Sequence, residues 1–498
     1  MTVNEFIEIL KNPPAHHLHV DNLGETILFE NIDFDYFQIN IDFATERHIK
    51  FKNVSINNFT LKGLKTKGTV TFEDVKSTVN SFNFIEIEAK QLVFSGNSEF
   101  NGGLNIQNCI LDFLAFNYIT FTYHVVVKKC IIRETILSAD FYAIFFQEEN
   151  KLSFLRAYGG IISELHISNG NINYLGIYGP IILKNTFISK GKFGMIFIDS
   201  LGLEKFNLKN PEDKHFELEV DALHIKNVGK SFISIITNLI LNRLRFEDLF
   251  SSKESIISLY NININFLEFS NFINYGQINL NNVGINGIIS FLNSDVGKLT
   301  FISCNFLQSL IDFKKSKIIE TFIIGCEFPK KFTNSNHLDQ IEAFSQIKKI
   351  YENRGSQKDA LDYYSLEMNA LNDSIPLKGN FWEKVNLWMN KISTNHGVNW
   401  QKGLASTLCV SAIFYLLYVI SLRAYSINPC DCKYWSEFGN ILSYFLEFIN
   451  PTHKTDFIAE KLKVPPTGLS RFIEGLSRIF IAYFIFQLIQ AFRKHGKK

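Results

Sequence analysis

The chain has 498 residues, of which 49 are phenylalanine, and it carries 50 lysine and arginine residues against 49 aspartate and glutamate residues. The length allows two or three domains, and the near-zero net charge argues against a generally basic nucleic-acid-binding protein. The opening MTVNEFIEILKNPP has charges within its apolar part and no small-residue cleavage site. It is therefore not a secretory signal, and we expect the large N-terminal part to stay in the cytoplasm.

Residues 1–334 carry an internal repeat with a period near 22. SDVGKLTFISCNF from Ser294 returns as SKIIETFIIGCEF from Ser316, and GQINLNNV from Gly276 returns as GKLTFISC from Gly297. Further echoes are LRFEDL from Leu244, LEFSNF from Leu267, LHIKNV from Leu223, LHISNG from Leu165, NCI from Asn108 and KCI from Lys129. Apolar and polar residues alternate within each unit, which indicates short strands. The pattern predicts a mainly β domain, a right-handed parallel β-helix solenoid with coils of about 22 residues, as the ligand or sensor domain.

Coil stacking has consequences for single residues. It places Cys109 over Cys130 and Cys304 over Cys326, where we expect them to pack in the core. The step from Leu267 to Leu299 is longer than one coil and implies an inserted hairpin or an extra half-coil. A β-sandwich gives no reason for the echoes, and a leucine-rich repeat lacks its helical half.

Many β-helices cut polysaccharides, and those enzymes need clustered carboxylates on one strand face. Acidic pairs such as Glu86 and Glu88 do not recur here at the coil spacing, and the HHLH run from His16 has no acidic or cysteine partner nearby. Motifs for phosphate loops, zinc proteases and nucleophile elbows do not occur, nor does CxxC. We therefore expect no enzyme activity, no cofactor and no metal. A carbohydrate-active enzyme of the cell envelope stays as an alternative and would need the solenoid outside the cell.

One part of the repeat is a candidate ligand surface. Its basic residues are Lys62, Lys65, Lys67, Lys128, Lys129 and Arg133, and its interleaved aromatics are Tyr118, Phe121 and Tyr123. Such a surface can follow a phosphate backbone while the rings stack on bases. Ordinary solvated turns explain the same residues.

Residues 335–398 change to helical spacing and form a predicted coupling segment. One helix starts near Asp339 and ends at Gly355, and a second begins at Ser356, giving a helical hairpin. A third helix, Asn380–Ser393, gathers its apolar residues on one face, which predicts a helix lying in the membrane interface. Packing against the hairpin is the alternative. The candidate coupling residues are Trp382, Trp388 and Trp400.

Residues 399–498 form a predicted all-α transmembrane domain. The first span is 400–423, a short re-entrant, pore-like helix is 434–449, and the second span is 470–493. Span, re-entrant helix, span is the plan of two-span potassium channels, which are tetramers, but the TVGYG filter is absent and potassium selectivity is not implied. A simple anchoring hairpin is the alternative. Cys430 and Cys432, between the spans, either oxidise outside the cytoplasm or stay as unconnected thiols.

The second span is unusually polar, and charged residues within a span face a partner helix or water rather than lipid. The candidate pore-lining residues are Arg478, Gln487, Gln490, Glu447 and Asn440. The basic end, which includes Arg493 and Lys494, is typical of a cytoplasmic terminus.

Three stretches carry a family resemblance: AFSQIKKIYENRGSQKDALDYYSLEMNAL from Ala343, WMNKISTNHGVNW from Trp388, and the ending LSRIFIAYFIFQLIQAFRKHGKK. They are similar to bacterial membrane proteins that join a β-helical or pentapeptide-like domain to a C-terminal two-span region. The best-understood of these resemble the HalB channel-like effectors of Hailong anti-phage defence. The resemblance implies that a partner nucleotidyltransferase makes single-stranded DNA oligomers that hold the effector shut, and that their loss opens a toxic pore. It assigns no residue to the DNA.

The sequence thus predicts an oligomeric, tetrameric channel-like effector of abortive infection in the bacterial inner membrane. Its N-terminal domain and C-terminus are expected in the cytoplasm, and a ligand such as a single-stranded DNA oligomer is expected on the β-helix. A membrane-anchored β-helix binding scaffold without a pore is the alternative.

Overall fold

The computed structural model describes residues 1–21, 24–77, 81–209, 218–228, 231–306, 308–332, 336–376, 380–422, 439 and 442–496. The chain divides into two compact units, Met1–Asn334 and Ser335–Lys498.

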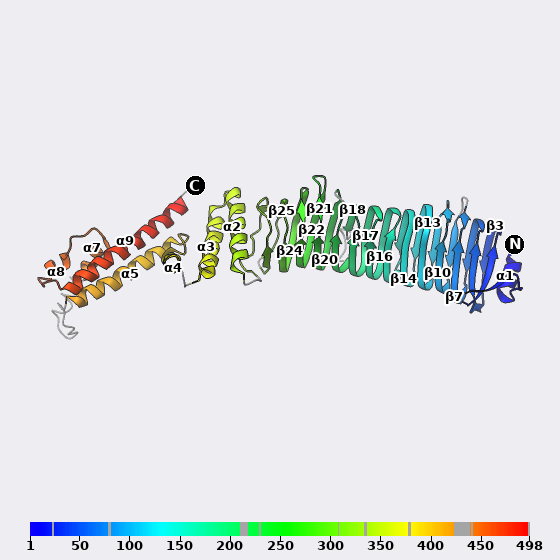
Figure 1. Cartoon of the computed structure of the whole chain (residues 1–498), viewed down its shortest axis with the longest axis horizontal. Helices are drawn as coiled ribbons and strands as arrows, with labels where there is room; N and C mark the ends of the chain where they lie inside the picture. The colour runs from blue at the N-terminus through cyan, green and yellow to red at the C-terminus, as the bar shows by residue number, and fades with distance from the viewer. Residues whose placement is uncertain are drawn as a thin grey trace. The chain divides into compact units, whose positions relative to one another are not determined.

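The first unit is a β-solenoid of about 14 turns over residues 26–324 (Figure 1), which confirms the predicted fold class. Apart from the antiparallel pair of β1 and β2, neighbouring coils pair in parallel, as in β16 with β17. The strands of the first half are β1 Leu18–Asp21, β2 Gly24–Glu30, β3 Asp33–Asn40, β4 Ala44–Thr45, β5 His48–Lys52, β6 Ser55–Lys62, β7 Lys65–Glu73, β8 Lys76–Ser77, β9 Phe82–Ile85, β10 Glu88–Ser95, β11 Glu99–Phe100, β12 Leu104–Gln107, β13 Ile110–Lys128 and β14 Ile131–Gln147. Those of the second half are β15 Lys151–Gly159, β16 Ile161–Tyr178, β17 Ile182–Asp199, β18 Gly202–Lys209, β19 Leu218–Lys226, β20 Ile233–Glu247, β21 Phe250–Ser251, β22 Ile256–Ser270, β23 Ile273–Asn274, β24 Gln277–Leu292, β25 Lys298–Ile302, β26 Leu310–Lys314 and β27 Phe322–Ile324.

The core is built from columns of equivalent residues, one from each coil. One column runs through Ile27, Ile49, Val70, Leu92, Leu114, Thr135, Leu155, Leu175, Ile196, Leu223, Leu244, Leu267, Ile289 and Ile311. Two residues further along each strand, Phe51, Phe72 and Phe94 stack with ring centres 4.6 and 5.3 Å apart. Each buried ring contributes about 1.5–3 kcal/mol by burial, and each ring pair adds about 0.5–1.5 kcal/mol. The abundance of phenylalanine is therefore explained by the interior of the solenoid.

A short helix, α1 Val3–Lys11, covers the start of this core. Thr2 and Glu5 form a capping box at its first turn, which satisfies two backbone donors. Phe6 and Leu10 are buried, and the ring of Phe6 stacks on that of Phe29 with 4.7 Å between the ring centres.

The strand register confirms several of the predicted repeats and corrects two. Leu244 pairs with Leu267, as predicted. Leu267 in turn pairs with Ile289, whereas Leu299 pairs with Ile278, so Leu267 and Leu299 lie on different sides of the coil. The predicted insertion between them is wrong, because a complete coil separates Leu267 from its true successor.

The LHISNG segment is the second correction. Leu165 pairs with Ile144 and Thr186, and therefore stands in a different column from Leu223, which pairs with Ile196 and Leu244. The similar segments that begin at Leu165 and Leu223 therefore lie on two different sides of the coil and are not equivalent positions of the repeat.

The turns of the solenoid use asparagine in the left-handed region. Asn238, Asn261 and Asn282 have φ of 58°, 52° and 53°, a conformation that asparagine tolerates better than most residues. Asn261 Nδ2 donates to Asn238 Oδ1 at 3.0 Å, and Asn282 Nδ2 donates to Asn261 Oδ1 at 2.8 Å. The amides thus form a ladder that joins successive turns.

The predicted cysteine columns also pack as expected. Cys109, Cys130, Cys304 and Cys326 are buried free thiols. The neighbouring Cys130 thiol and burial raise the pKa of Cys109, so it stays protonated and behaves as a small apolar residue.

The second unit is helical. Its helices are α2 His337–Arg354, α3 Gln357–Ser374, α4 Phe381–Thr394, α5 Trp400–Ser421, α7 Phe445–Ile449, α8 Phe457–Lys461 and α9 Gly468–Gly496. The hairpin of α2 and α3 is held by stacked Tyr351 and Tyr363, 5.3 Å apart, and by an ion pair of 2.8 Å between Lys348 and Glu367. Asn336 caps α2, and Gly355 ends it with a φ of 81°, at the predicted residue.

Two helices, Trp400–Ser421 and Gly468–Lys494 within α9, are long and apolar enough to cross a membrane. They pack side by side in opposite directions, because Trp400 stacks on Phe492 at 5.2 Å while Phe414 contacts Phe480 at 5.4 Å.

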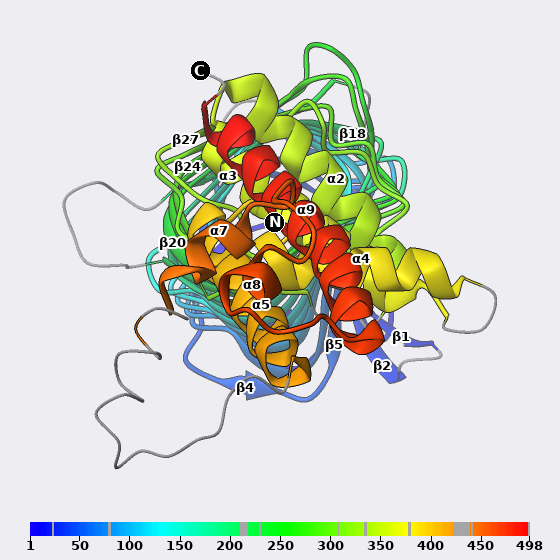
Figure 2. The same ribbon diagram turned by 90° about the vertical axis from the view of Figure 1, so that its left-hand side faces the viewer.

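The segment between these helices folds back on them. Figures 1 and 2 show α7 and α8 beside α5 and α9, and Phe448 and Ile458 pack there against Tyr415, Tyr418 and Ile481. Of the predicted re-entrant helix 434–449, residues 439 and 442–449 lie within the described residues, and they include α7. Asn440, Cys430 and Cys432 lie outside the described residues.

Candidate functional site

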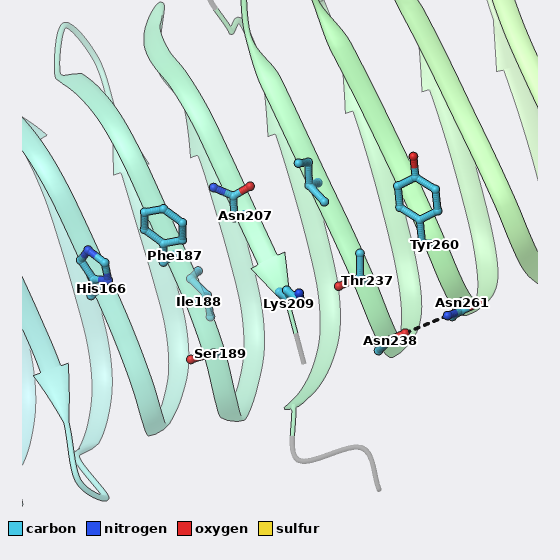
Figure 3. Close-up of a pocket in the computed structure, with 11 residues that line it drawn as sticks. His166, Phe187, Ile188, Ser189, Asn207, Lys209, Thr237, Asn238, Tyr260 and Asn261 are labelled. Carbon is cyan, nitrogen blue, oxygen red and sulfur yellow. Dashed lines mark hydrogen bonds between the residues drawn. The ribbon is translucent and has the colours of Figure 1, made fainter. Parts of the chain in front are cut away.

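The solenoid carries an open groove of about 760 Å³ on its outer surface, here called the outer groove (Figure 3). It is lined by His166, Phe187, Ile188, Ser189, Asn207, Lys209, Ile235, Thr237, Asn238, Tyr260 and Asn261. The register places His166, Phe187, Asn207 and Ile235 in one outward-facing column over consecutive coils. The volume lies within the range of about 300–1,000 Å³ that is usual for small-molecule sites.

A stack of three rings forms one end of the outer groove. The ring centres of Phe145 and His166 are 4.7 Å apart, and those of His166 and Phe187 are 4.8 Å apart, with the planes within 20° of parallel. Parallel strands repeat at about 4.8 Å, so equivalent rings on successive coils stack face to face. Phe187 is 41% exposed and is followed in the column by the much smaller Asn207. The groove therefore offers an exposed ring edge and face next to amide and hydroxyl groups.

His166 contributes a titratable imidazole ring to the lining of the outer groove. His166 Nε2 lies 3.3 Å from Glu164 Oε2, but no cysteine or serine nucleophile is hydrogen-bonded to that ring among the interactions described. In the described part of the chain, no group of three or more histidine, cysteine, aspartate or glutamate side chains is arranged to hold a metal ion.

The predicted basic surface is largely paired with carboxylates on neighbouring coils. The pairs are Lys62–Glu86 at 3.6 Å, Lys65–Glu88 at 3.9 Å, Lys67–Glu46 at 2.6 Å, Lys128–Glu148 at 3.9 Å and Lys129–Glu148 at 3.5 Å. Exposed pairs of this kind are worth about 0–1 kcal/mol each, but they reduce the positive potential of the surface. Arg133 lines a shallow groove of about 340 Å³ together with Asp112 and Lys151.

The prediction that Phe121 belongs to that surface is wrong. Phe121 is buried in the core and stacks between Phe100 and Phe141, at 4.9 and 5.1 Å, so its ring is not available to a base. Tyr118 and Tyr123 are exposed. The outer groove was missed by the sequence analysis, although Phe145, His166 and Phe187 repeat at the coil spacing.

The second unit contains a polar junction at the turn between α4 and α5. Asn395, His396 and Gly397 have φ of 52°, 61° and 79°, three consecutive residues in the left-handed region. Lys494, near the end of α9, donates to His396 O at 3.1 Å, and its Nζ lies 4.2 Å from the centre of the Tyr364 ring on α3. We call these contacts of Lys494 with His396 and Tyr364 the Lys494 junction.

Further hydrogen bonds tie the same helices together. Asn395 Nδ2 donates to Ser365 Oγ at 3.2 Å, which joins the turn to α3. Ser406 Oγ of α5 donates to Ser393 O of α4 at 2.9 Å. Tyr483 of α9 donates to Asn390 Oδ1 of α4 at 2.7 Å. The hairpin, α4 and both membrane-type helices therefore meet at one place.

His396 is buried at this place. Burial, together with the charges of Lys391, Lys494 and Lys402, lowers the pKa of His396 to about 4. The imidazole is therefore neutral at physiological pH, which avoids placing a fourth positive charge among the three ammonium groups.

The three tryptophans predicted to couple the domains lie around this unit in different ways. Trp382 is 80% exposed and Trp388 is 56% exposed, both on α4. Trp400 instead stacks on Phe492 and joins the start of α5 to the end of α9.

One predicted pore-lining residue, Arg478, is already engaged within the single chain. Arg478 donates to Glu474 Oε1 at 3.0 Å and to His453 O at 2.8 Å. Glu474, 2% exposed, also binds the His453 ring at 3.1 Å and accepts from the Asp456 backbone N–H at 3.2 Å. We call these four residues the Glu474 cluster. The sequence predicted that charged residues within the second span face a partner helix or water, but it did not identify Glu474, His453 or Asp456 as members of this cluster.

The remaining pore candidates differ in exposure. Gln487 is 8% exposed because its own chain covers it. In the single chain, this side chain therefore does not reach a surface that could line a pore. Gln490 is partly exposed and Glu447 is exposed. Pore lining by Gln490 and Glu447 stays a prediction.

No family model, curated protein or solved structure matches the chain.

Proposed function

We propose that the chain is an oligomeric, channel-like membrane effector whose β-solenoid binds a ligand and whose helical unit passes the bound state on to two membrane spans. The Lys494 junction is the observation that carries this proposal. Through Lys494, the end of the second span contacts both the hairpin helix α3 and the turn that begins the first span. A displacement of α3 must therefore break these contacts or move both spans.

The outer groove supports a ligand that contains flat rings. The exposed ring of Phe187 ends a stack, so a ring of the ligand can extend it, and such stacking is worth about 1–3 kcal/mol per base in single-stranded nucleic acid. A single-stranded DNA oligomer is the ligand that the family resemblance implies. In this proposal, its loss opens the pore and damages the membrane of an infected cell.

The membrane helices support assembly of several copies. Two spans per chain cannot enclose a lumen alone, and α5 exposes a row of apolar residues that includes Ile413, Leu416 and Ile420. Such faces meet lipid or neighbouring copies. The basic residues at the α4–α5 turn and at the end of α9 support a cytoplasmic location for this end of the spans.

The test uses the purified full-length protein in liposomes loaded with a self-quenching dye. We expect dye release from oligomeric protein and suppression of release by single-stranded oligonucleotides. The Phe187→Ala variant should still form the oligomer and release the dye, but single-stranded oligonucleotides should no longer suppress that release. Absence of both dye release and planar-bilayer conductance, from every oligomer with and without oligonucleotide, would overturn the pore.

A membrane-anchored binding scaffold without a pore is the second candidate. The observation in its favour is that Arg478 is paired with Glu474 and Gln487 is buried within one chain, as an anchor requires. A monomer in detergent that binds the ligand and releases no dye would establish the scaffold in place of the channel.

A further inference from the structure

The helical unit has an apolar groove where α4 meets the two membrane-type helices, here called the membrane groove. It is lined by Trp388, Met389 and Ile392 of α4, Val410, Ile413 and Phe414 of α5, and Phe480 and Phe484 of α9. Its volume is about 270 Å³, just below the range of about 300–1,000 Å³ that is usual for small-molecule sites. With no polar side chain among these residues to orient a polar ligand, the groove suits a slender hydrocarbon chain.

Hydrogen bonds fix the walls of the membrane groove. Asn390 of α4 accepts from Tyr483 of α9, and Ser393 of α4 accepts from Ser406 of α5. α4 is thereby attached to both helices beside the apolar lining. Because these contacts hold the walls in place, the groove does not require the occupant to form it.

The end of α4 beside the membrane groove is positively charged. Lys391 precedes the lining residue Ile392, and Lys402 Nζ donates to the backbone oxygen of Lys391 at 2.8 Å. The charges of Lys391, Lys402 and Lys494 also act together on the buried His396. Three ammonium groups therefore gather where α4 turns into α5, a position that complements an anionic headgroup.

We propose that the membrane groove binds an acyl chain of an anionic phospholipid, whose phosphate lies at Lys391 and Lys402. The inference rests on the membrane insertion that is part of the proposed function. Trp388, half exposed at the mouth of the groove, suits the boundary between headgroups and acyl chains, where tryptophan is enriched. A lipid in this place would contact α4 and both spans at once.

The experiment is native mass spectrometry of the purified full-length protein, titrated with phosphatidylglycerol or with zwitterionic phosphatidylcholine. Ile413→Trp fills the groove and should weaken phosphatidylglycerol binding at least tenfold. Leu416→Trp adds the same ring at an exposed position of α5 and serves as the matched control. Lys391→Gln and Lys402→Gln should each weaken phosphatidylglycerol binding about fivefold and leave phosphatidylcholine binding unchanged.

Equal binding of phosphatidylglycerol by the Ile413→Trp and Leu416→Trp variants would overturn the proposal. So would equal affinity of the natural protein for the two lipids, or displacement of bound lipid by millimolar inorganic phosphate, which would identify the occupant as a free anion. If Ile413→Trp loses its helical circular dichroism, Val410→Phe replaces it. Carbonate extraction of membranes separates this inference from the proposed function. A chain that fails to insert into the membrane contradicts both proposals. An inserted chain without bound lipid contradicts this inference alone.

Discussion

The ammonium group of Lys494 lies 4.2 Å from the centre of the Tyr364 ring, so the last turns of the second membrane-type helix contact the helical hairpin. Cation–π contacts are worth about 0.5–2 kcal/mol, and the same ammonium also donates to His396 O. The two helices are far apart in sequence, and this side chain joins them directly.

Lys494→Met should loosen the turn between α4 and α5. The variant loses the hydrogen bond and the cation–π contact, together about 1–3 kcal/mol of local stability. Hydrogen exchange of the amides of residues 395–399 should become correspondingly faster. Arg493→Gln, an exposed neighbour, is the control and should leave exchange unchanged. Equal protection in the Lys494→Met variant and the natural protein would contradict the role given to this contact.

Gly397→Ala should destabilise the helical unit more than Gly355→Ala does. Both glycines have positive φ, 79° and 81°. Replacing either one with alanine therefore carries the same backbone cost of about 1–2 kcal/mol. An added Cβ at Gly397 would lie 2.9 Å from Lys494 Nζ, whereas at Gly355 it meets nothing within 4 Å. Thermal unfolding in detergent should therefore give the lower Tm for Gly397→Ala. Equal Tm values would show that Lys494 moves aside at no cost.

The stability of the helical unit should fall between pH 6.5 and pH 4 through His396. The pKa of this residue is about 4 in the folded chain and near 6.5 when unfolded. The unfolded state therefore binds more protons in this interval, and stability decreases as the pH falls. The resulting decrease in the free energy of unfolding is at most about 3 kcal/mol.

The check for this prediction is denaturant unfolding in detergent at pH 7 and pH 5. His396→Asn keeps a residue that tolerates positive φ but removes the titrating ring, so its pH dependence should be smaller. An unchanged pH dependence in that variant would assign the effect to other groups.

Phe187→Ala should weaken binding of single-stranded oligonucleotides to the solenoid. Removing one stacking ring costs about 1–3 kcal/mol, a loss of about 5- to 150-fold in affinity. Phe322→Ala is the matched control, because Phe322 is exposed in the same outward column but outside the outer groove. Fluorescence anisotropy with a labelled oligonucleotide measures both. Equal losses in the two variants would place the ligand elsewhere.

Glu474→Gln should release the segment that precedes α9. Arg478 and His453 would lose a buried charged partner, and breaking a buried pair costs about 3–5 kcal/mol. Trypsin should then cut faster after Lys454, Lys461 and Lys463. Glu460→Gln removes an exposed carboxylate that is paired with Lys454 and should have little effect. Unchanged cleavage would mean that apolar packing around Phe448 alone holds this segment.

The solenoid was predictable because stacking demands the same kind of side chain at each coil. What the repeats could not show is which side of the coil a motif occupies. Leu165 and Leu223 begin nearly identical segments, yet one pairs with Ile144 and the other with Ile196. Both sides bury leucine at the same position of a strand, so the local sequence is the same.

The candidate sites were less predictable, for two physical reasons. A polar residue within a span requires a partner, but sequence does not tell whether the partner is water or the same chain, and Arg478 uses Glu474 and the His453 backbone. The outer groove depends on outward positions, which repeat less regularly than the core. Its ring stack of Phe145, His166 and Phe187 was nevertheless visible as three rings spaced 21 residues apart.

The contact between Phe6 and Phe29 has a consequence for solubility. The first coil of a β-solenoid presents open strand edges and an uncovered core, to which another solenoid could add and so build fibres. α1 places Phe6 over that core at 4.7 Å and buries Leu10 beside it. This short helix, together with β1 paired on the edge of β2, therefore opposes end-to-end polymerisation at the N-terminal face of the stack.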